Sequence, residues 1–440
     1  MDVRADIAIV GAGASGLSLA YRLCGAAAPR GRGGTGGPGP GPGPGIVLLD
    51  APPGPARPPE RTWCFWEPRR GEFDAALTTY WDRLRVTGPR GRVTEHALGP
   101  QRYKMLRSGP FAAFVGARLD AHPGLRRAEA HVHEVTDGPE GAEVLGTTAD
   151  GRPVRVRARW VFDSRPPAAL PPARTTLLQH FKGWFVRTRC PVLDAGGADL
   201  MDFRTRQPAT GLSFGYVLPW STREALVEYT EFSPRPCGQA AYDSALRHYV
   251  EEVLGHTRYE VTGVESGVIP MSDGHFAPRA GASVFRIGAA GGATRPSTGY
   301  TFSAIQRQTR QIADAWRRGE VPAPLPVHSR RALAMDAVLL RALDTGRLDG
   351  AAFFTGLFER VPVRRLLRFL DGETGPAEEF AVGVRTPVSP MLRTLLELPT
   401  LRRAGPYGQR GPRDEESTRV LPQTPQTPQT PKSPHAPHRS

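Results

Sequence analysis

The sequence predicts a mixed α/β fold in which a parallel sheet is interleaved with an antiparallel sheet and followed by helices. Three observations lead to this prediction. Residues 6–16 read as a short apolar strand, a glycine-rich turn and the start of a helix. Residues 176–262 are rich in strand-like segments, whereas residues 303–318 and 327–400 have helical patterns. Elements of these two kinds bury their apolar faces by packing in layers.

The first glycine-rich segment, Asp6-Ile-Ala-Ile-Val-Gly11-Ala-Gly13-Ala-Ser-Gly16, has the spacing of a dinucleotide-binding turn. Gly11 allows the turn, Gly13 lets backbone amides approach a pyrophosphate, and Gly16 lets the helix pack closely on the strand. A second strand, Ile46-Val-Leu-Leu-Asp50, ends in an acid that is placed to bind an adenosine ribose. Its distance from Gly16 is normal once the Gly/Pro tract of residues 31–45 is counted as an insertion. We therefore predict a dinucleotide site.

The composition excludes several classes of protein. The 57 Lys and Arg outnumber the 43 Asp and Glu by 14. No helix-turn-helix, zinc finger or RNA-binding aromatic signature accompanies this charge, so we expect no nucleic-acid partner. Attraction to anionic lipid, worth about 1 kcal/mol per well-placed Lys or Arg, is the alternative use of the charge. The 4 cysteines form no CxxC pair and the 11 histidines no HExxH motif, so no metal site is predicted.

Two apolar stretches raise the question of a membrane. Residues 7–28 imitate a signal peptide, but Arg22 interrupts them and the glycine spacing already accounts for them. No other stretch reaches the ~18 apolar residues of a spanning helix. We therefore expect a cytoplasmic protein, soluble or peripheral. Residues 351–370 combine large apolar side chains with four Arg. Such a segment is either an interfacial element or part of the core.

Changes in composition and pattern divide the chain into four parts. The C-terminal tail is polar, Pro-rich and repetitive, and cannot bury enough apolar surface to fold. We expect a nucleotide-binding part at residues 1–60, 102–166 and 262–322, a substrate-binding part at 61–101 and 167–261, a helical region at 323–403, and a disordered tail at 404–440.

Four motifs then occur in a recognisable order. They are Arg61-Thr-Trp63-Cys-Phe65-Trp66, Leu226-Val-Glu228-Tyr-Thr230, Gly267-Val-Ile-Pro270-Met271 and the second glycine-rich segment, Gly288-Ala-Ala-Gly-Gly-Ala-Thr-Arg-Pro296-Ser-Thr-Gly299-Tyr300. Together they closely resemble the flavoprotein lycopene β-cyclase family of carotenoid biosynthesis. The resemblance runs from about residue 5 to 395, apart from the Gly/Pro insertion.

The resemblance implies an FAD-binding Rossmann-like domain of the geranylgeranyl reductase and p-hydroxybenzoate hydroxylase type. It implies an isomerase that cyclises the ends of lycopene, giving γ-carotene and then β-carotene. Substrate and product are isomers, so FAD would act in its reduced form as a non-redox cofactor, kept reduced by NAD(P)H. The implied location is the inner face of the cell membrane, with lycopene and γ-carotene as the small-molecule partners.

The resemblance points to Glu228 as the catalytic acid. Ring closure needs a proton at C2 of the chain end, a site that tolerates a carbocation, and loss of a proton from C6. A carboxyl group in apolar surroundings can donate that proton because desolvation raises its pKa. Tyr229 stands where the family has a second acid, and in a strand Glu231 faces the side opposite to Glu228. A solvated strand carboxylate is the alternative reading of Glu228.

The remaining site residues would bind the cofactor or line the substrate tunnel. Many FAD hydroxylases have Gly-Asp at the second glycine-rich segment, where this chain has Gly288-Ala289. This difference weighs against an oxygen-using hydroxylase, although a reductase or monooxygenase acting on an isoprenoid stays open. The predicted FAD-binding residues are Gly11, Gly13, Gly16, Asp50, Arg107, Gly288, Gly291, Gly292, Pro296, Thr298 and Gly299. The aromatic tunnel candidates are Trp63, Phe65, Trp66, Trp184, Phe185, Tyr216 and Trp220, and ordinary core packing is their alternative.

Overall fold

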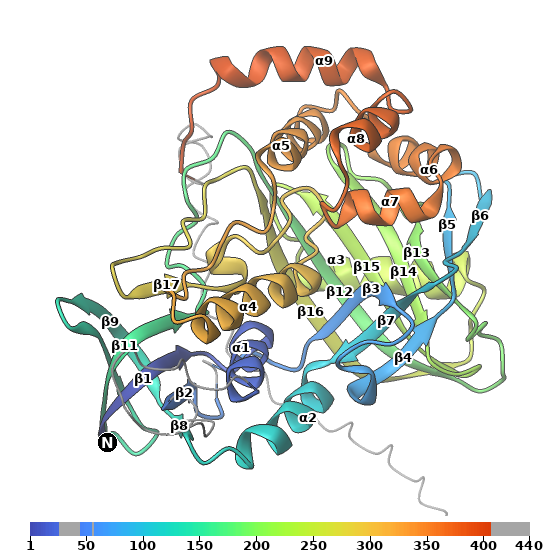
Figure 1. Ribbon diagram of the computed structural model, residues 1–440. Coiled ribbons are helices and arrows are strands. Elements are labelled where there is room, and N and C mark those ends of the chain that lie inside the picture. The colour runs from blue at the N-terminus through green and yellow to red at the C-terminus, as the bar shows by residue number, and fades with distance from the viewer. Residues whose placement is uncertain (26–44, 55–56, 406–440) are drawn as a thin grey trace, which may run out of the picture.

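The computed structural model describes residues 1–25, 45–54 and 57–405. The predicted Gly/Pro insertion and the predicted disordered tail fall almost entirely outside these residues. Two seven-stranded sheets and one three-stranded sheet form the framework. Figure 1 shows the sheet that contains the N-terminus at the lower left, the other seven-stranded sheet to its right, and the C-terminal helices α5 to α9 at the top.

The first sheet contains the predicted strand–turn–helix unit. Its strand order is β8-β2-β1-β11-β10-β9, and β17 pairs with the end of β11. The pairs β1–β2, β2–β8, β1–β11 and β11–β17 are parallel, whereas β9 and β10 add an antiparallel extension. The strands are β1 (Asp2–Val10), β2 (Ile46–Asp50), β8 (Leu125–Glu129), β9 (His131–Gly138), β10 (Gly141–Thr147), β11 (Pro153–Asp163) and β17 (Val284–Arg286).

Three helices cover one face of this sheet. Ile7 and Ile9 of β1 pack in one buried cluster with Leu17, Phe111 and Ile312. These three side chains come from α1 (Ala14–Cys24), α2 (Ser108–Asp120) and α4 (Phe302–Arg317). The alternation of apolar residues along β1 thus provides the surface on which the helices pack.

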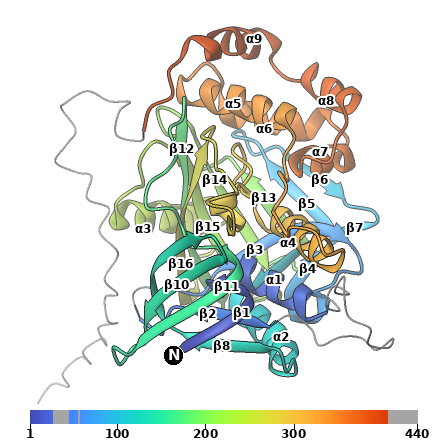
Figure 2. The ribbon, with the colours of Figure 1, turned by 60° about the vertical axis from the view of Figure 1, so that its left-hand side comes forward.

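The second large sheet has the order β16-β12-β15-β14-β13-β5-β6 and is antiparallel except at β13–β5. Helix α3 (Gln239–His248) covers one face through Tyr242 and Leu246, and a π-helical turn at Tyr249–Val253 follows it. The opposite face looks towards the C-terminal helices, as the second view also shows (Figure 2). The strands are β5 (Arg83–Thr87), β6 (Val93–Ala97), β12 (Thr176–Thr188), β13 (Gly197–Asp202), β14 (Leu212–Pro219), β15 (Glu224–Ser233) and β16 (Tyr259–Ser272).

A three-stranded sheet joins the two larger ones. It consists of β3 (Thr62–Pro68), β7 (Gln101–Arg107) and β4 (Leu77–Trp81), with a short 3-10 helix at Asp74–Ala76. Trp63 and Phe65 of β3 both stack on Phe302 of α4. The predicted division of the chain at residues 261 and 262 falls inside β16. The assignment of the parts to FAD and to substrate stays a prediction.

The C-terminal region is helical. It contains α5 (Arg330–Asp344), α6 (Gly350–Arg360), α7 (Val363–Leu370), α8 (Pro376–Gly383), α9 (Val388–Glu397) and a 3-10 turn at Leu398–Thr400. The side chains of Ser329 and Asp349 cap α5 and α6 by accepting hydrogen bonds from backbone amides. In the part of the chain that the structure describes, no helix has both the length and the apolar character needed to cross a bilayer.

Residues 351–370 pack against the core. Phe354, Phe358, Leu366 and Leu367 are all buried in the cluster that includes the second large sheet. The interfacial alternative for this segment is therefore not supported. Exposed large apolar side chains lie instead on α8, on α9 and in the turn between these two helices, and we call this group the α8–α9 stripe. They are Phe380, Val384, Val388, Leu392 and Leu396.

Candidate functional site

The turn between β1 and α1 has the geometry that its glycines predict. Gly11 has a φ of +94°, which favours glycine. A Cβ on Gly16 would lie 1.9 Å from the carbonyl oxygen of Gly11, so only glycine allows this close approach. The Asp50 carboxylate at the end of β2 accepts a hydrogen bond of 3.0 Å from the amide of Ala12. The acid therefore lies directly beside the turn.

The second glycine-rich segment meets the first at the start of α1. Residues Gly288–Gly291 form a 3-10 turn after β17. Their backbone is held by Gln308 of α4, which accepts from the amide of Gly288 at 2.8 Å and donates to the carbonyl of Gly291 at 3.3 Å. A Cβ on Gly288 would lie 2.1 Å from Oγ of Ser15 in the first turn of α1.

The place where the two glycine-rich segments meet, at the start of α1, fits a dinucleotide pyrophosphate. Helix α1 starts after Gly13, which makes no side-chain cap. No atom lies within 4 Å of the position that a Cβ on Gly13 would take. Open space therefore lies beside Gly13 at the start of the helix, where the first amides have no partner within the helix, and such amides bind phosphate oxygens well. The residues present therefore fit the group that the sequence motif predicts.

A pocket of about 740 Å³ lies on the face of the second large sheet that is opposite to α3. Strands β12, β14, β15 and β16 form its wall, the 288–302 segment and β3 border it, and helices α5 to α7 contribute Leu333, Phe354 and Leu370. Most lining side chains are apolar or aromatic. Of the predicted site residues, those that line this pocket are Glu228, Gly291, Gly292, Pro296, Thr298 and Gly299. Those that do not are Gly11, Gly13, Gly16, Asp50, Arg107 and Gly288.

Glu228 faces this pocket from β15. Its side chain is half-buried because it borders the cavity. Oε1 accepts a hydrogen bond of 2.6 Å from the hydroxyl of Thr230. Burial raises the pKa of Glu228 to about 8, the Thr230 hydrogen bond opposes this shift, and the charge of Glu265 adds to it. At neutral pH the carboxyl group therefore carries a proton that it can donate.

The other face of β15 carries a different polar network. The Tyr229 hydroxyl donates to Oε2 of Glu231 at 2.9 Å, and Glu231 lies near His180 and Cys237. Ligand atoms of His180, Glu231 and Cys237 lie within 4.8 Å of one another, so this group could hold a metal ion. As predicted from strand alternation, Glu231 points away from Glu228.

Hydrogen bonds account for this cluster without a metal. The Ser233 hydroxyl donates to the carbonyl of Arg235, so Nε2 of His180 must donate to Ser233, at 2.8 Å. Nδ1 of His180 then accepts from the hydroxyl of Tyr242 at 2.7 Å. In this tautomer neither ring nitrogen offers a free lone pair. The expectation of no metal centre nevertheless stays a prediction.

Arg107 lies at the junction of β7 and α2. Its guanidinium is 4.7 Å from the centre of the Phe185 ring and pairs with Glu60. Its predicted contact with the flavin stays a prediction. A nearby arginine that sequence reasoning did not single out, Arg61, does line the pocket, and its guanidinium donates to the carbonyl of Ser266.

Sequence reasoning also missed Glu265 of β16, which is buried and lines the pocket. Oε1 of Glu265 accepts from the amide of Thr62 at 2.7 Å, and Oε2 accepts from the Thr62 hydroxyl at 2.6 Å. Its only signal in the sequence is its place just before the Gly267–Met271 motif. Strand register, which the sequence does not display, brings it to the pocket.

The aromatic tunnel candidates separate into two groups. Trp63 and Tyr216 line the pocket. For the others, the core-packing alternative describes their positions better: Phe65, Trp66, Trp184, Phe185 and Trp220 belong to buried clusters or pack against them.

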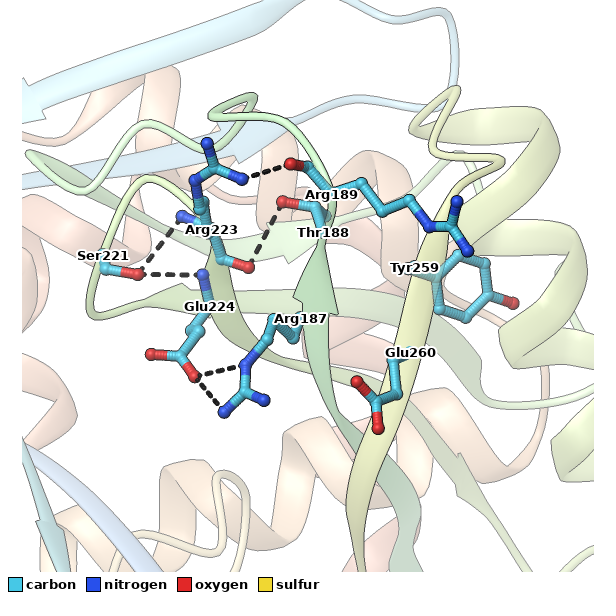
Figure 3. Close-up of a pocket in the computed structure, with 8 residues that line it drawn as sticks. All are labelled: Arg187, Thr188, Arg189, Ser221, Arg223, Glu224, Tyr259 and Glu260. Carbon is cyan, nitrogen blue, oxygen red and sulfur yellow. Dashed lines mark hydrogen bonds and ion pairs between the residues drawn. The ribbon is translucent and has the colours of Figure 1, made fainter.

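A second pocket, of about 610 Å³, lies at the end of β12 and at the starts of β15 and β16. Figure 3 shows that arginines and acids line it and that Arg187 pairs with Glu224. The guanidinium nitrogen and the carboxylate oxygen of this pair are 3.0 Å apart. None of the predicted site residues belongs to it. The first pocket is therefore the candidate functional site.

Comparisons with known proteins agree with this geometry. No curated protein matches the sequence. Among solved structures, a geranylgeranyl bacteriochlorophyll reductase-like protein from Thermoplasma acidophilum is 11% identical with a TM-score of 0.59, covering 90% of this chain and 100% of its own. A flavoprotein/dehydrogenase from Cytophaga hutchinsonii is 10% identical with a TM-score of 0.55, covering 90% and 100%.

A p-nitrophenol 4-monooxygenase from Pseudomonas putida is 14% identical with a TM-score of 0.53, covering 90% of this chain and 98% of its own. Likenesses at such low identity show the fold alone. They confirm the predicted fold class, which is that of geranylgeranyl reductases and aromatic hydroxylases. The model of the lycopene cyclase protein family matches residues 6–396. The chain therefore belongs to the lycopene cyclase family.

Proposed function

We propose that the protein is a lycopene β-cyclase, an isomerase that converts the linear ends of lycopene into β-rings by way of γ-carotene. One observation carries the proposal. Glu228 is an acid with a pKa raised to about 8, and it faces a largely apolar pocket that the second glycine-rich segment borders. Such a group can protonate a hydrocarbon, because it holds its proton at neutral pH and faces a site lined mostly by apolar side chains.

The pocket residues suit the protonation that starts ring closure and the carbocation that follows it. Glu228 donates its proton to C2, and the electrons of the terminal double bond form the new C–H bond. The cation at C1 is then attacked by the next double bond, which closes the ring. Trp63 and Tyr216 present aromatic side chains to the same pocket. Aromatic rings stabilise a nearby cation by about 0.5–2 kcal/mol.

FAD is the proposed cofactor. The first amides of α1 and Asp50 would hold its pyrophosphate and ribose, and Gly291, Gly292 and the Pro296–Gly299 turn would approach its flavin end. When bound in its reduced form, with NAD(P)H as reductant, the flavin would supply negative charge that stabilises the carbocation. Because the cyclisation leaves the oxidation state of the substrate unchanged, no net redox step is needed.

A membrane surface is the proposed partner, on the inner face of the cell membrane. A C40 hydrocarbon partitions into bilayers, so the enzyme has to collect it there. The exposed stripe on α8 and α9, from Phe380 to Leu396, is an apolar surface of the kind that inserts at a lipid interface. Arg393 lies exposed on α9 within this stripe, where it can approach lipid phosphates.

Incubation of the purified protein with lycopene, FAD and a reductant tests the function. The expected product is cyclic and has the same mass as lycopene. A gain of two hydrogens would show a reductase instead, and a gain of one oxygen would show a monooxygenase. Either result would replace the cyclase proposal with the redox alternative that the fold also allows.

A further inference from the structure

Glu228 and Glu265 flank the same residue of the central strand. In the pairing of β12 with β15, Gly183 is opposite Glu228, and in the pairing of β12 with β16, Gly183 is opposite Glu265. Directly opposed residues point to the same face of a sheet. With neighbouring strands about 4.7–4.9 Å apart, the two Cα atoms lie about 9–10 Å from each other. Both carboxyl groups line the same pocket.

The β12 residue between the two acids has no side chain, because it is Gly183. A Cβ on Gly183 would lie 2.7 Å from Cδ1 of Leu226 and 3.5 Å from Cβ of Glu228, so a larger residue there would displace the end of the Leu226 side chain and press on Glu228. Among the described residues that line the pocket, Glu228 and Glu265 are the two carboxylic acids. The site therefore holds a pair of acids although Tyr229 replaces the second acid of the family motif.

The surroundings of the two acids differ. Both oxygens of Glu265 accept hydrogen bonds from Thr62, and an acceptor with two donors suits a charged carboxylate. Glu228 accepts one hydrogen bond, from Thr230. Two carboxyl groups whose environments differ in this way can act as acid and base at the same pH.

We propose that Glu265 is the catalytic base, which takes up the proton that C6 loses after Glu228 has protonated C2. This inference rests on the proposed cyclase function. The C6–H bond breaks, its electron pair forms the ring double bond at the C5 cation, and the proton goes to a Glu265 oxygen. The substrate gains one proton and loses one, so it is isomerised. Glu265 must then return its proton, through water, to the Glu228 carboxylate before the next cycle.

The other titratable groups around Glu228 are poorer bases. Burial raises the pKa of Cys64 and of Tyr103, which keeps both protonated, and the hydroxyls of Tyr103 and Tyr216 contact each other. Arg61 is a cation, and Tyr300 also has a pKa raised by burial. Of the two histidines that line the pocket, His328 has a pKa that burial lowers to about 4, and His275 is exposed.

The test compares the Glu265→Gln and Glu260→Gln variants with the wild type, on the FAD-loaded protein with lycopene. Glu260 is an exposed acid on the same strand and serves as the matched control. Glu265→Gln should lower the rate of β-ring formation by about 10²- to 10⁴-fold, the usual effect of removing a general base. The product that this variant still forms should include rings whose double bond is not between C5 and C6, because the C5 cation can lose a proton from C4 instead of from C6. Glu260→Gln should resemble the wild type.

Two further measurements separate catalysis from structure. Loss of the Glu265 charge should lower the pKa of Glu228, so the alkaline limb of the pH–rate profile, near 8 in the wild type, should move to lower pH. Glu265→Asp should retain part of the rate and form β-rings alone. Normal β-ring formation by Glu265→Gln, in a preparation whose wild type cyclises lycopene, would overturn this inference. A wild type that forms no rings would instead overturn the proposed function.

Discussion

The hydroxyl of Thr230 donates a hydrogen bond of 2.6 Å to Oε1 of Glu228, from the same face of β15. Alternation along the strand places the two side chains side by side above the pocket and turns Tyr229 and Glu231 to the α3 side. The hydrogen bond stabilises the charged form of Glu228, whereas burial disfavours it, and burial has the larger effect. The acidity of Glu228 is thus set by two opposed effects.

Replacing Thr230 by Val should therefore raise the pKa of Glu228 further. The donor that favours the carboxylate is lost, while the size of the side chain is kept. We expect the alkaline limb of the pH–rate profile to move above its wild-type position near 8. Thr230→Ser keeps a hydroxyl and should restore the wild-type limb. An unchanged or lower limb in Thr230→Val would mean that Thr230 does not control this acid.

Glu228 should also make the folded protein less stable as the pH rises. Its folded pKa, about 8, lies above the ordinary value of 4.5, so between these values the folded state keeps a proton that the unfolded state releases. Stability therefore falls with rising pH in that window. Relative to the wild type, Glu228→Gln should gain about 1–3 kcal/mol in unfolding free energy between about pH 5 and pH 8. Denaturant titrations of both proteins at about pH 5 and about pH 8 measure the unfolding free energies. A difference between the two proteins that is the same at both pH values would contradict this prediction.

The fold class and part of the candidate site could be predicted from the sequence, because glycine-rich turns and the alternation of side chains along a strand depend on neighbouring residues. The turn at Gly11–Gly16 follows from backbone sterics, and the opposite directions of Glu228 and Glu231 follow from the two-residue period of a strand. Glu265 was not predictable in this way. It meets Glu228 only because β15 and β16 both pair with β12, a long-range register that no local pattern encodes.

The sequence left one segment undecided, residues 351–370, for a physical reason. Residues 351–370 have the composition of an interfacial helix, but the second large sheet offers a facing apolar surface that buries Phe354 and Phe358. The composition of a segment does not show which other part of the protein packs against it. The exposed stripe on α8 and α9 has the same type of residues without a partner surface in the described chain.

The cofactor proposal predicts a specific effect of Gly13→Ala. Gly13 has a φ of −80°, which alanine tolerates, and the new methyl group meets no protein atom. It would occupy the open space beside Gly13, where the cofactor proposal puts the pyrophosphate. We expect FAD affinity to fall at least ~10-fold while the stability of the FAD-free protein stays within about 1 kcal/mol of the wild type. Fluorescence titration with FAD measures the affinity.

Gly238 provides the matched control. It also precedes a helix, with a φ of −68° and no atom within 4 Å of the position that a Cβ would take. Gly238→Ala should leave FAD binding unchanged. Equal affinity of the two alanine variants for FAD would contradict the placement of the pyrophosphate at α1.

The membrane proposal predicts that the α8–α9 stripe binds lipid. Phe380 and Leu396 are 72% and 70% exposed, the two most exposed large apolar side chains among the described residues. The double variant Phe380→Ser, Leu396→Ser should float less with vesicles that contain anionic lipid, because it lacks apolar side chains that would insert into the lipid interface. The paired control changes Val93 and Val192, which are also exposed, to Ser and should float normally.

If the variant with Ser at positions 380 and 396 still bound vesicles as the wild type does, the α8–α9 stripe would not be the lipid-binding surface. A change in molar mass, measured by light scattering without lipid, would show that the stripe joins two copies of the chain instead.

The most direct test of the account is the rate at which Glu228→Gln cyclises lycopene under reducing conditions, measured beside Glu231→Gln. A glutamine side chain has nearly the same size as glutamate but no acidic proton, so the rate should fall by about 10²- to 10⁴-fold with FAD content unchanged. Glu231 lies on the opposite face of β15, in the hydrogen-bond network of Tyr229, and its change should have a far smaller effect. Cyclisation by Glu228→Gln at close to the wild-type rate would contradict the assignment of Glu228 as the acid.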